Sequence, residues 1–448
     1  MPSRYRGAGN KQGMKIRDFL EIDFILLFAA LVLVVFGILF IYSSGITSEG
    51  VLISSEYKKQ IVWASAGLVF ALVISMLNYK RISDLAVYFY IGTLALLVVT
   101  FVFGRVISGS RWLRIGFLGF QASEFAKIAT ILFLAWYLEI TKRNQNDFFR
   151  FIICSVIAMI PMMLVLVQPD LGTALVFIPI LLGMAYVAGI PVRYIAFFGF
   201  AIAFAGVFLV LPFWQSYIMS NAIPALMMLA NSRFVTAGCM ILLLIAAIAW
   251  IGYARYQKSY FYWIRYCTFI FIFSLGGSYL AQKMLKQYQV MRLIVFMNPN
   301  VDPRGFGWQI IQSVTAIGSG GPFGKGYLQG TQSHYRYLPE QSTDFIFSIL
   351  SEEWGFIGGV LVFALFLIIF LRLVRIMQIT SDSFGSYIVA GLIYMYAFHF
   401  VVNVGMTMGI MPITGIPLMF VSYGGSAVLS SMIGIGLAMS IYVRRFTH

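Results

Sequence analysis

A carboxylate that could act as a general base stands where a long loop gives way to an apolar stretch. Asp344 lies in the run LPEQSTDFIF, residues 338–347. A carboxylate at the mouth of a membrane cavity that faces cationic side chains can accept a proton from a hydroxyl group. The same position also suits the first turn of a helix, with Ser342 or Thr343 as the capping residue and Asp344 complementing the helix dipole. From the residues alone, both interpretations stay open.

Basic side chains gather in two segments, 104–122 and 283–344, that the sequence places on the outer face of a membrane. Lysine and arginine normally concentrate in the inner loops of membrane proteins. Their presence on the outer face therefore needs another reason, and a bound anion is the obvious one. The residues are Arg105, Arg111, Arg114, Lys283, Lys286, Arg292, Arg304, Lys325 and Arg336.

Two ionisable residues, Glu124 and Lys127, stand three positions apart within an apolar segment. On a helix this spacing puts them on one face. Charges inside a membrane are costly and usually face a bundle interior or a wet cavity. They could form a structural ion pair, or Lys127 could lend its charge to a phosphate at the floor of a cavity.

Five further polar residues carry weaker signals. His399 and Asn403 are spaced i and i+4, which favours a hydrogen-bonded pair over a catalytic one. Asp170, in QPDLGT, is typical of a structural turn. Glu352 and Glu353 follow Asp344 by two helical turns and are expected to partner basic residues that the sequence does not identify.

The elements that must position these residues are membrane-spanning helices. Of the 448 residues, 60% are hydrophobic and 10% charged, which excludes a soluble enzyme, a disordered chain and a coiled coil. With three cysteines, three histidines and no CxxC pair, a zinc site or disulfide framework is also excluded. The net charge of +15 lies mostly in the predicted inner loops, so it gives no support to nucleic-acid binding.

A span needs about 20 apolar residues. This rule predicts an all-α polytopic membrane protein with about twelve transmembrane helices, at 21–45, 59–78, 84–103, 123–141, 150–168, 172–190, 192–212, 234–253, 260–282, 345–371, 384–405 and 421–443. More than half of the lysines and arginines then fall on one side, which predicts cytoplasmic N- and C-termini and a cytoplasmic tail over 1–20.

The predicted outer loop, 283–344, is much longer than an ordinary connection, and such loops are usually functional or disordered. Its aromatic and glycine content indicates an ordered loop that approaches a ligand closely. The stretch GSGGPFGKG, residues 318–326, resembles a phosphate-binding loop in composition only, because the spacing that nucleotide binding requires is absent.

Several segments, taken in order, resemble the shape, elongation, division and sporulation family of bacterial cell-wall polymerases (RodA, FtsW, SpoVE). The segments are GSRWL (109–113), QASEFAK (121–127), QPDLGT (168–173), NPNVDPRGFGWQIIQS (298–313), AIGSGGPFGKGYLQGTQS (316–333), LPEQSTDFIF (338–347) and GIMPITGIPLMFVSYGGSA (409–427). The GTQS run and the Gln-Ser before Thr343 resemble the RodA branch more than the FtsW branch.

The chain departs from the family pattern in two places. Ala122 stands where the family usually has proline. The family has ten spans, so the resemblance assigns the excess to an inserted helix pair within 213–283. An added pair is even in number and leaves 283–344, which carries the site, on the outer face. The whole chain, 1–448, is then one membrane domain.

The resemblance implies a glycosyltransferase that polymerises lipid II, a disaccharide-pentapeptide on undecaprenyl pyrophosphate, during cell elongation in the bacterial cytoplasmic membrane. Asp344 is the implied catalytic base, in a transfer that inverts the anomeric centre. A divalent cation, Mg²⁺ or Mn²⁺, is an expected aid, and no organic cofactor is implied. The implied partners are a class B penicillin-binding protein and other elongation-complex membrane proteins. The implied substrate-binding residues are Arg111, Trp112, Arg114, Glu124, Lys127, Arg292, Gln312, Lys325, Gln329 and Glu340.

Two other functions remain as alternatives. Twelve spans with charges inside the membrane also describe a transporter or flippase of lipid-linked precursors. Against a carrier, the sequence has no evident internal repeat and its ionisable residues cluster toward the outer face. A non-catalytic scaffold that recruits a transpeptidase is the third possibility, and it predicts that Asp344 is dispensable.

Overall fold

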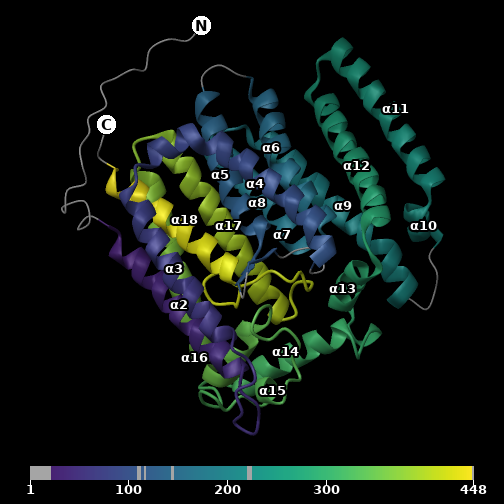
Figure 1. The fold of residues 1–448 in the computed structure, drawn as a ribbon. Helices are drawn as coiled ribbons and strands as arrows, with labels where there is room; N and C mark the ends of the chain where they lie inside the picture. The colour runs from purple at the N-terminus through teal and green to yellow at the C-terminus, as the bar shows by residue number, and fades with distance from the viewer. Residues whose placement is uncertain (1–21, 108–112, 116–117, 143–145, 219–223, 446–448) are drawn as a thin grey trace, which may run out of the picture.

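The structure is a computed structural model that describes residues 22–107, 113–115, 118–142, 146–218 and 224–445 (Figure 1). The predicted tail at 1–20 lies outside the described residues. The helices are α2 Phe24–Ser44, α3 Glu56–Met76, α4 Tyr79–Ile107, α5 Ala122–Ile140, α6 Asp147–Val167, α7 Leu171–Leu175, α8 Phe177–Val187, α9 Val192–Ile218, α10 Pro224–Met227, α11 Ser232–Tyr256, α12 Ser259–Met284, α13 Gln287–Met297, α14 Phe306–Gly320, α15 Thr331–His334, α16 Ile346–Ile379, α17 Ser383–Thr407 and α18 Gly425–Val443. A short hairpin pairs β1 Leu113–Ile115 antiparallel with β2 Leu118–Phe120.

Ten helices within the described ranges are long and apolar enough to cross a membrane, namely α2, α3, α4, α6, α9, α11, α12, α16, α17 and α18. The chain is therefore a multi-pass membrane protein. Each of the twelve predicted spans corresponds to helical structure, but the count of twelve is not confirmed. α5 carries three ionisable residues, and the predicted span at 172–190 is broken into α7 and α8 at Val176.

The centre of the bundle is formed by α5, α17 and α18. α18 packs against α3 and also contacts α5, while α17 packs against α5, α8 and α16. Close approach depends on small residues at these crossings: a Cβ added to Gly436 of α18 would meet the backbone of Ala71 in α3 at 2.7 Å. This tight packing gives polar side chains of α5 and α17 a protein environment instead of lipid.

The predicted outer loop is largely helical, as α13, α14 and α15 with a 3₁₀ turn at Pro299–Val301 fill most of it. Figure 1 shows these three helices together at one end of the bundle, which we call the α13–α15 end. α14 packs along α16, and Ser313 of α14 donates a 2.6 Å hydrogen bond to the carbonyl oxygen of Thr407. The expectation of an ordered loop is confirmed.

The segment 213–283 contains the end of α9, then α10, a 3₁₀ turn, α11 and most of α12. α11 packs against α12, and α12 packs against α9. Figure 1 shows α11 and α12 at the edge of the bundle, on the opposite side from α2 and α16. That this pair is an insertion into a ten-span core stays a prediction.

Candidate active site

Asp344 stands in a tight turn immediately before α16. The turn begins at Glu340, whose carbonyl oxygen accepts the N–H groups of Thr343, Asp344 and Phe345 at 3.3, 3.1 and 3.4 Å. Because this turn precedes the helix, Asp344 lies two residues before Ile346. The prediction that Asp344 stands in the first turn of the span is therefore wrong.

The predicted helix caps before α16 are also wrong. No side chain caps α16, whose N-cap residue is Phe345. The Ser342 hydroxyl donates instead to Glu56 of α3 at 2.7 Å, and that of Thr343 donates back to the carbonyl oxygen of Glu340 at 3.1 Å. The Ser342 and Thr343 hydroxyls therefore fix the loop that leads to Asp344.

Asn403 of α17 holds the main chain at Asp344. Its Nδ2 donates to the carbonyl oxygen of Asp344 at 3.0 Å and to that of Ile416 at 2.8 Å. The predicted hydrogen-bonded pair of His399 and Asn403 is wrong, since His399 bonds to Lys127 and Pro417. Asn403 is fully buried, so its amide links the Asp344 turn rigidly to the segment that follows α17.

The Asp344 carboxylate and the Arg292 guanidinium approach each other beside Gly415. A Cβ placed on Gly415 would lie 3.3 Å from Oδ2 of Asp344 and 3.5 Å from Nη1 of Arg292. Gly415 also has φ +72°, a backbone conformation that favours glycine. The glycine thus provides both the turn and the space beside which the Asp344 carboxylate and the Arg292 guanidinium lie.

Burial raises the pKa of Asp344 to about 6, while the charge of Arg292 acts in the opposite direction. The charges of Glu340 and Asp170 add to the increase. A carboxyl group with this pKa is mostly ionised at pH 7 and still basic enough to take a proton from a reacting hydroxyl, which is the property that a general base needs.

A small cavity of about 80 Å³ adjoins this pair. Asp170, Tyr288, Arg292 and Thr414 are among its lining residues, so it joins α13 to the turn before α7 and to the segment after α17. Asp170 caps α7 by accepting the N–H of Thr173 at 3.2 Å, and its other oxygen accepts from Gln121 at 3.0 Å. The predicted structural turn is confirmed, and the same turn forms a wall of the site.

Glu124 and Lys127 form a buried ion pair with Nζ 2.9 Å from Oε1. Lys127 Nζ also lies 2.9 Å from Nε2 of His399, whose Nδ1 lies 3.0 Å from the carbonyl oxygen of Pro417. Nδ1 must therefore carry the proton, and Nε2 accepts from Lys127. The Lys127 side chain has no exposed surface. These contacts favour the structural ion pair of the two alternatives, because no part of the Lys127 side chain is open to a phosphate in this structure.

Glu352 organises the glycine-rich loop at the α13–α15 end. Its buried carboxylate accepts from Lys325 Nζ at 2.7 Å and from the N–H groups of Thr331 and Gln332 at 2.8 and 3.0 Å. The neighbouring Glu353 accepts from the Ser43 hydroxyl and from the Leu328 N–H. The expected basic partner of Glu352 is thus Lys325, which the sequence had placed among the substrate-binding residues.

The remaining predicted residues are dispersed. Arg111 and Trp112 lie outside the described residues, as does the side chain of Arg114, although its backbone belongs to β1. Gln312 is half-buried on α14. Gln329 is exposed and lines a separate cavity of about 410 Å³ together with Thr331 and His334. Of the predicted substrate-binding set, the structure brings Arg292 and the Glu340 turn to Asp344.

A metal site built by the protein alone is not present in the described part of the chain, where no three His, Cys, Asp or Glu side chains come together. A Mg²⁺ ion usually needs only one or two carboxylates and takes its other ligands from substrate phosphates and water. Asp170, which lines the cavity, and Asp344, whose pKa the Asp170 charge raises, fit that kind of ion, and the metal requirement stays a prediction.

A family model described as "Cell cycle protein" (FtsW, RodA and SpoVE) matches residues 24–222 and 212–446. The chain belongs to this family. It is 49% identical over 435 residues to the peptidoglycan glycosyltransferase RodA of Treponema pallidum, which covers 96% of this chain and all of the relative. It is 31% identical to the peptidoglycan glycosyltransferase MrdB of Escherichia coli, over 96% of this chain and 95% of the relative.

Solved structures support the same family and fold. A chain of a structure described as "Structural coordination of polymerization and crosslinking by a peptidoglycan synthase complex" is 26% identical, with a TM-score of 0.64 over 95% of this chain and 99% of that chain. The Thermus thermophilus rod shape determining protein RodA has the same fold at 23% identity, with a TM-score of 0.59 over 96% of this chain. Membership of the FtsW/RodA/SpoVE family makes this chain a peptidoglycan glycosyltransferase involved in building the cell wall.

Three residues of this family member's site were missed from the sequence: Asn403 as the residue that holds Asp344, Gly415 as the glycine beside it, and Tyr288. Tyr288 lines the cavity and donates to the carbonyl oxygen of Pro169 at 3.2 Å. The dense Gly and Pro residues of GIMPITGIPLMF indicate an irregular segment close to other backbone. They do not indicate which side chain that segment approaches.

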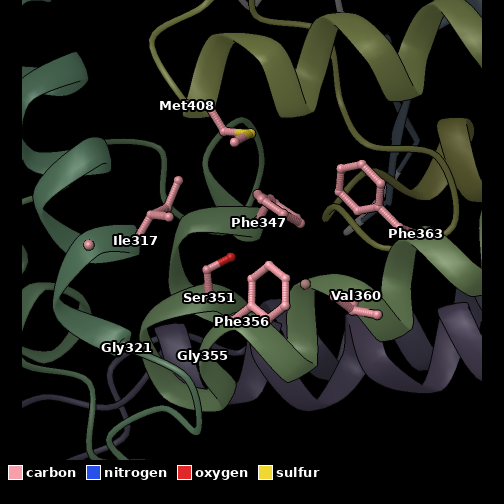
Figure 2. Close-up of a pocket in the computed structure, with 11 residues that line it drawn as sticks. Ile317, Gly321, Phe347, Ser351, Gly355, Phe356, Val360, Phe363 and Met408 are labelled. Atoms are coloured by element: carbon pink, nitrogen blue, oxygen red, sulfur yellow. The ribbon is translucent and has the colours of Figure 1, made fainter.

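An apolar groove of about 380 Å³ opens between α14, α16 and α17 (Figure 2). Phe347, Phe356 and Phe363 of α16 project into it in the close-up, with Met408 across from them. α16 is kinked at Gly355, which has φ +63° and lies against the backbone of Gly324. The groove begins at Phe347, three residues after Asp344, and is suited to an apolar chain.

Proposed function

We propose that the chain polymerises lipid II into glycan strands during cell elongation, with Asp344 as the general base. The observation that carries the proposal is the Asp344 carboxylate, held by Asn403 through its main chain and placed beside Arg292 at Gly415. A partly buried carboxylate with a raised pKa is suited to removing a proton from the attacking hydroxyl. The cation next to it is suited to stabilising the charge on the leaving group.

In the proposed reaction Asp344 takes the proton from the 4-hydroxyl of the acceptor GlcNAc as that oxygen attacks C1 of the donor MurNAc. The new bond joins O4 to C1. The bond from C1 to the pyrophosphate oxygen breaks, and its electron pair leaves with undecaprenyl pyrophosphate. Attack from the side opposite the leaving group inverts the anomeric centre from α to β, so the transfer needs one base and no covalent intermediate with the protein.

The second requirement is stabilisation of the negative charge on the departing pyrophosphate. Arg292 lines the cavity beside Asp344, and its guanidinium can donate two parallel hydrogen bonds to phosphate oxygens. A divalent cation bound through the pyrophosphate would add stabilisation of the same kind. Arg111 and Arg114 remain proposed contributors from the segment that includes β1.

The α13–α15 end is proposed to face outward, with both termini in the cytoplasm, in the bacterial cytoplasmic membrane. The distribution of lysine and arginine over the predicted loops supports this orientation. The groove between α14, α16 and α17 is proposed to take part of the prenyl tail, because it is apolar and starts near Asp344. A class B penicillin-binding protein is the proposed partner.

The test is polymerisation of labelled lipid II by the purified chain together with its transpeptidase partner, whose own active-site serine is removed. Asp344→Asn should lose about 10²- to 10⁴-fold in rate, the usual contribution of a positioned general base. Glu49→Gln, a change at an exposed carboxylate, is the matched control and should retain the wild-type rate.

Three results would separate the alternatives. Equal glycan ladders from wild type and a well-folded Asp344→Asn variant would reject Asp344 as the base. Absence of ladders from either protein, with transport of lipid II into liposomes, would favour the flippase. Growth that is unaffected by Asp344→Asn in cells, again without polymerisation in vitro, would favour a scaffold.

A further inference from the structure

A second apolar groove, which we call the aromatic groove, lies between α6 and α12 across α9, at the edge of the bundle where Figure 1 shows α12 beside α9. Its volume is about 490 Å³, within the range of ligand pockets. Ring centroids of Phe151 in α6 and Phe198 in α9 are 6.0 Å apart, and those of Phe197 in α9 and Phe273 in α12 are 5.8 Å apart. α9 therefore forms the floor, with α6 and α12 as walls.

The groove is elongated along the helices. On α6 its lining runs from Phe148 to Met159, a length of roughly 16 Å at 1.5 Å per residue. On α12 it runs from Tyr262 to Phe273. A long, apolar space that runs along membrane-spanning helices suits a lipid acyl chain better than a compact polar solute.

One charged side chain, Arg265, lines the groove among the described residues. It lies six residues after the start of α12, about 9 Å along the helix. Tyr253 and Tyr262 stack near its guanidinium, 5.6 and 5.8 Å from ring centroid to Cζ. None of the ion pairs formed by the described residues includes it. A cation inside an apolar groove is costly, so its position calls for an anion.

The surrounding sequence is strongly cationic. Residues 171–301 contain no Asp or Glu, and their lysines and arginines are Arg193, Arg233, Arg255, Lys258, Arg265, Lys283, Lys286 and Arg292. The Arg193 guanidinium lies at the groove, because it donates to the hydroxyl of the lining residue Tyr194 at 3.0 Å. Lys258 directly precedes α12. Asp147 opens α6 at this end and forms no ion pair with these cations in the described part of the chain.

We propose that the aromatic groove binds an anionic phospholipid of the surrounding membrane. An acyl chain lies along α6 and α12, and the phosphate lies near Arg265, with Arg193 and Lys258 at the rim. Exposed cations at a helix end follow from membrane orientation alone, but a cation within the groove does not. The lipid would join the outlying α11–α12 pair to the bundle through α9.

The test is native mass spectrometry of the detergent-purified chain with dioleoyl phosphatidylglycerol or dioleoyl phosphatidylcholine added. Wild type should bind the first phosphatidylglycerol molecule about fivefold more tightly than phosphatidylcholine, the gain that one Lys or Arg gives near an anionic membrane surface. Arg265→Gln should remove that preference, and Arg265→Lys should retain most of it. Arg233→Gln is the matched control and should behave as wild type. Arg233 is an exposed cation at the start of α11, whereas Arg265 and Lys258 follow the end of that helix.

A second variant tests the cavity itself. Ser155 is a small lining residue of α6, and Ser155→Phe should weaken binding of both lipids because the new ring occupies the groove. Equal affinity of wild type for the two lipids would overturn the proposal. An unchanged preference for phosphatidylglycerol in Arg265→Gln, or an equal loss of that preference in Arg233→Gln, would also overturn it. The same holds for unchanged lipid binding in Ser155→Phe, or for a polypeptide that occupies the groove and that phosphatidylglycerol does not displace.

Discussion

The amide of Asn403 donates a hydrogen bond of 3.0 Å to the main-chain carbonyl oxygen of Asp344. A second bond from the same nitrogen reaches Ile416, the residue after Gly415. One buried side chain of α17 therefore sets the distance between the proposed base and the glycine that leaves space beside it. The position of the Asp344 carboxylate depends on this contact more than on any cap of α16.

We expect Asn403→Leu to lower kcat for lipid II polymerisation by about 10²-fold, because a shift of about 1 Å in a reacting group can have that effect. KM should change little, since Asn403 does not line the cavity. Thr407→Val is the control: it is equally buried on α17, and its hydroxyl bonds only within its own helix. A similar kcat loss in both variants would indicate general damage to α17 instead of positioning.

The pH dependence should report the ionisation of Asp344. Burial raises its pKa to about 6, and only the deprotonated form can accept a proton. kcat/KM for polymerisation should therefore be constant above about pH 7 and fall about tenfold per pH unit well below 6. Because Arg292 lowers this pKa, Arg292→Gln should move the midpoint to higher pH. A flat profile from pH 5 to 8 would contradict Asp344 as the base.

The buried pair of Glu124 and Lys127 predicts a pattern across single and double variants. Lys127→Met leaves the Glu124 charge without its partner inside the bundle, and the loss of one partner of a buried pair typically costs about 3–5 kcal/mol. A strongly lowered Tm is expected. The double variant Glu124→Gln/Lys127→Met should recover most of the Tm, because no charge is then stranded.

Polymerisation by that double variant decides between the two interpretations of Lys127. A structural pair predicts that activity returns together with Tm. A stable double variant without activity would instead show that Lys127 acts on the substrate, despite its complete burial in this structure.

Glu352 is expected to hold the loop between Lys325 and His334 in place. Glu352→Ala leaves the N–H groups of Thr331 and Gln332 and the ammonium of Lys325 without their acceptor, at a cost of about 1–3 kcal/mol for each buried group that stays unsatisfied. Limited proteolysis should show faster cleavage within the loop. Lys325→Met removes one donor and should have a smaller effect. Equal cleavage rates in wild type and Glu352→Ala would contradict this role.

Much of the site's location could be predicted from the sequence. Asp344 stands out because it is a carboxylate at the boundary between a cation-containing loop and an apolar helix, and Arg292 because it is a cation on the proposed outer face. The pairing of Glu124 with Lys127 follows from i and i+3 spacing, which is local. The spans follow from length and apolarity, except where charges in α5 or the break at Val176 interrupt the pattern.

Only the tertiary structure decided which distant side chains meet. Asn403 to Asp344, Lys127 to His399 and Lys325 to Glu352 are contacts between different helices or loops, and no spacing rule reaches across such separations. The same holds for Arg265, whose place in the aromatic groove depends on how α12 packs on α9. The length of each hydrophobic segment and the spacing of nearby residues can be read directly from the sequence. Which polar groups face one another depends on the rotation and depth of each helix, and packing of the whole bundle sets both.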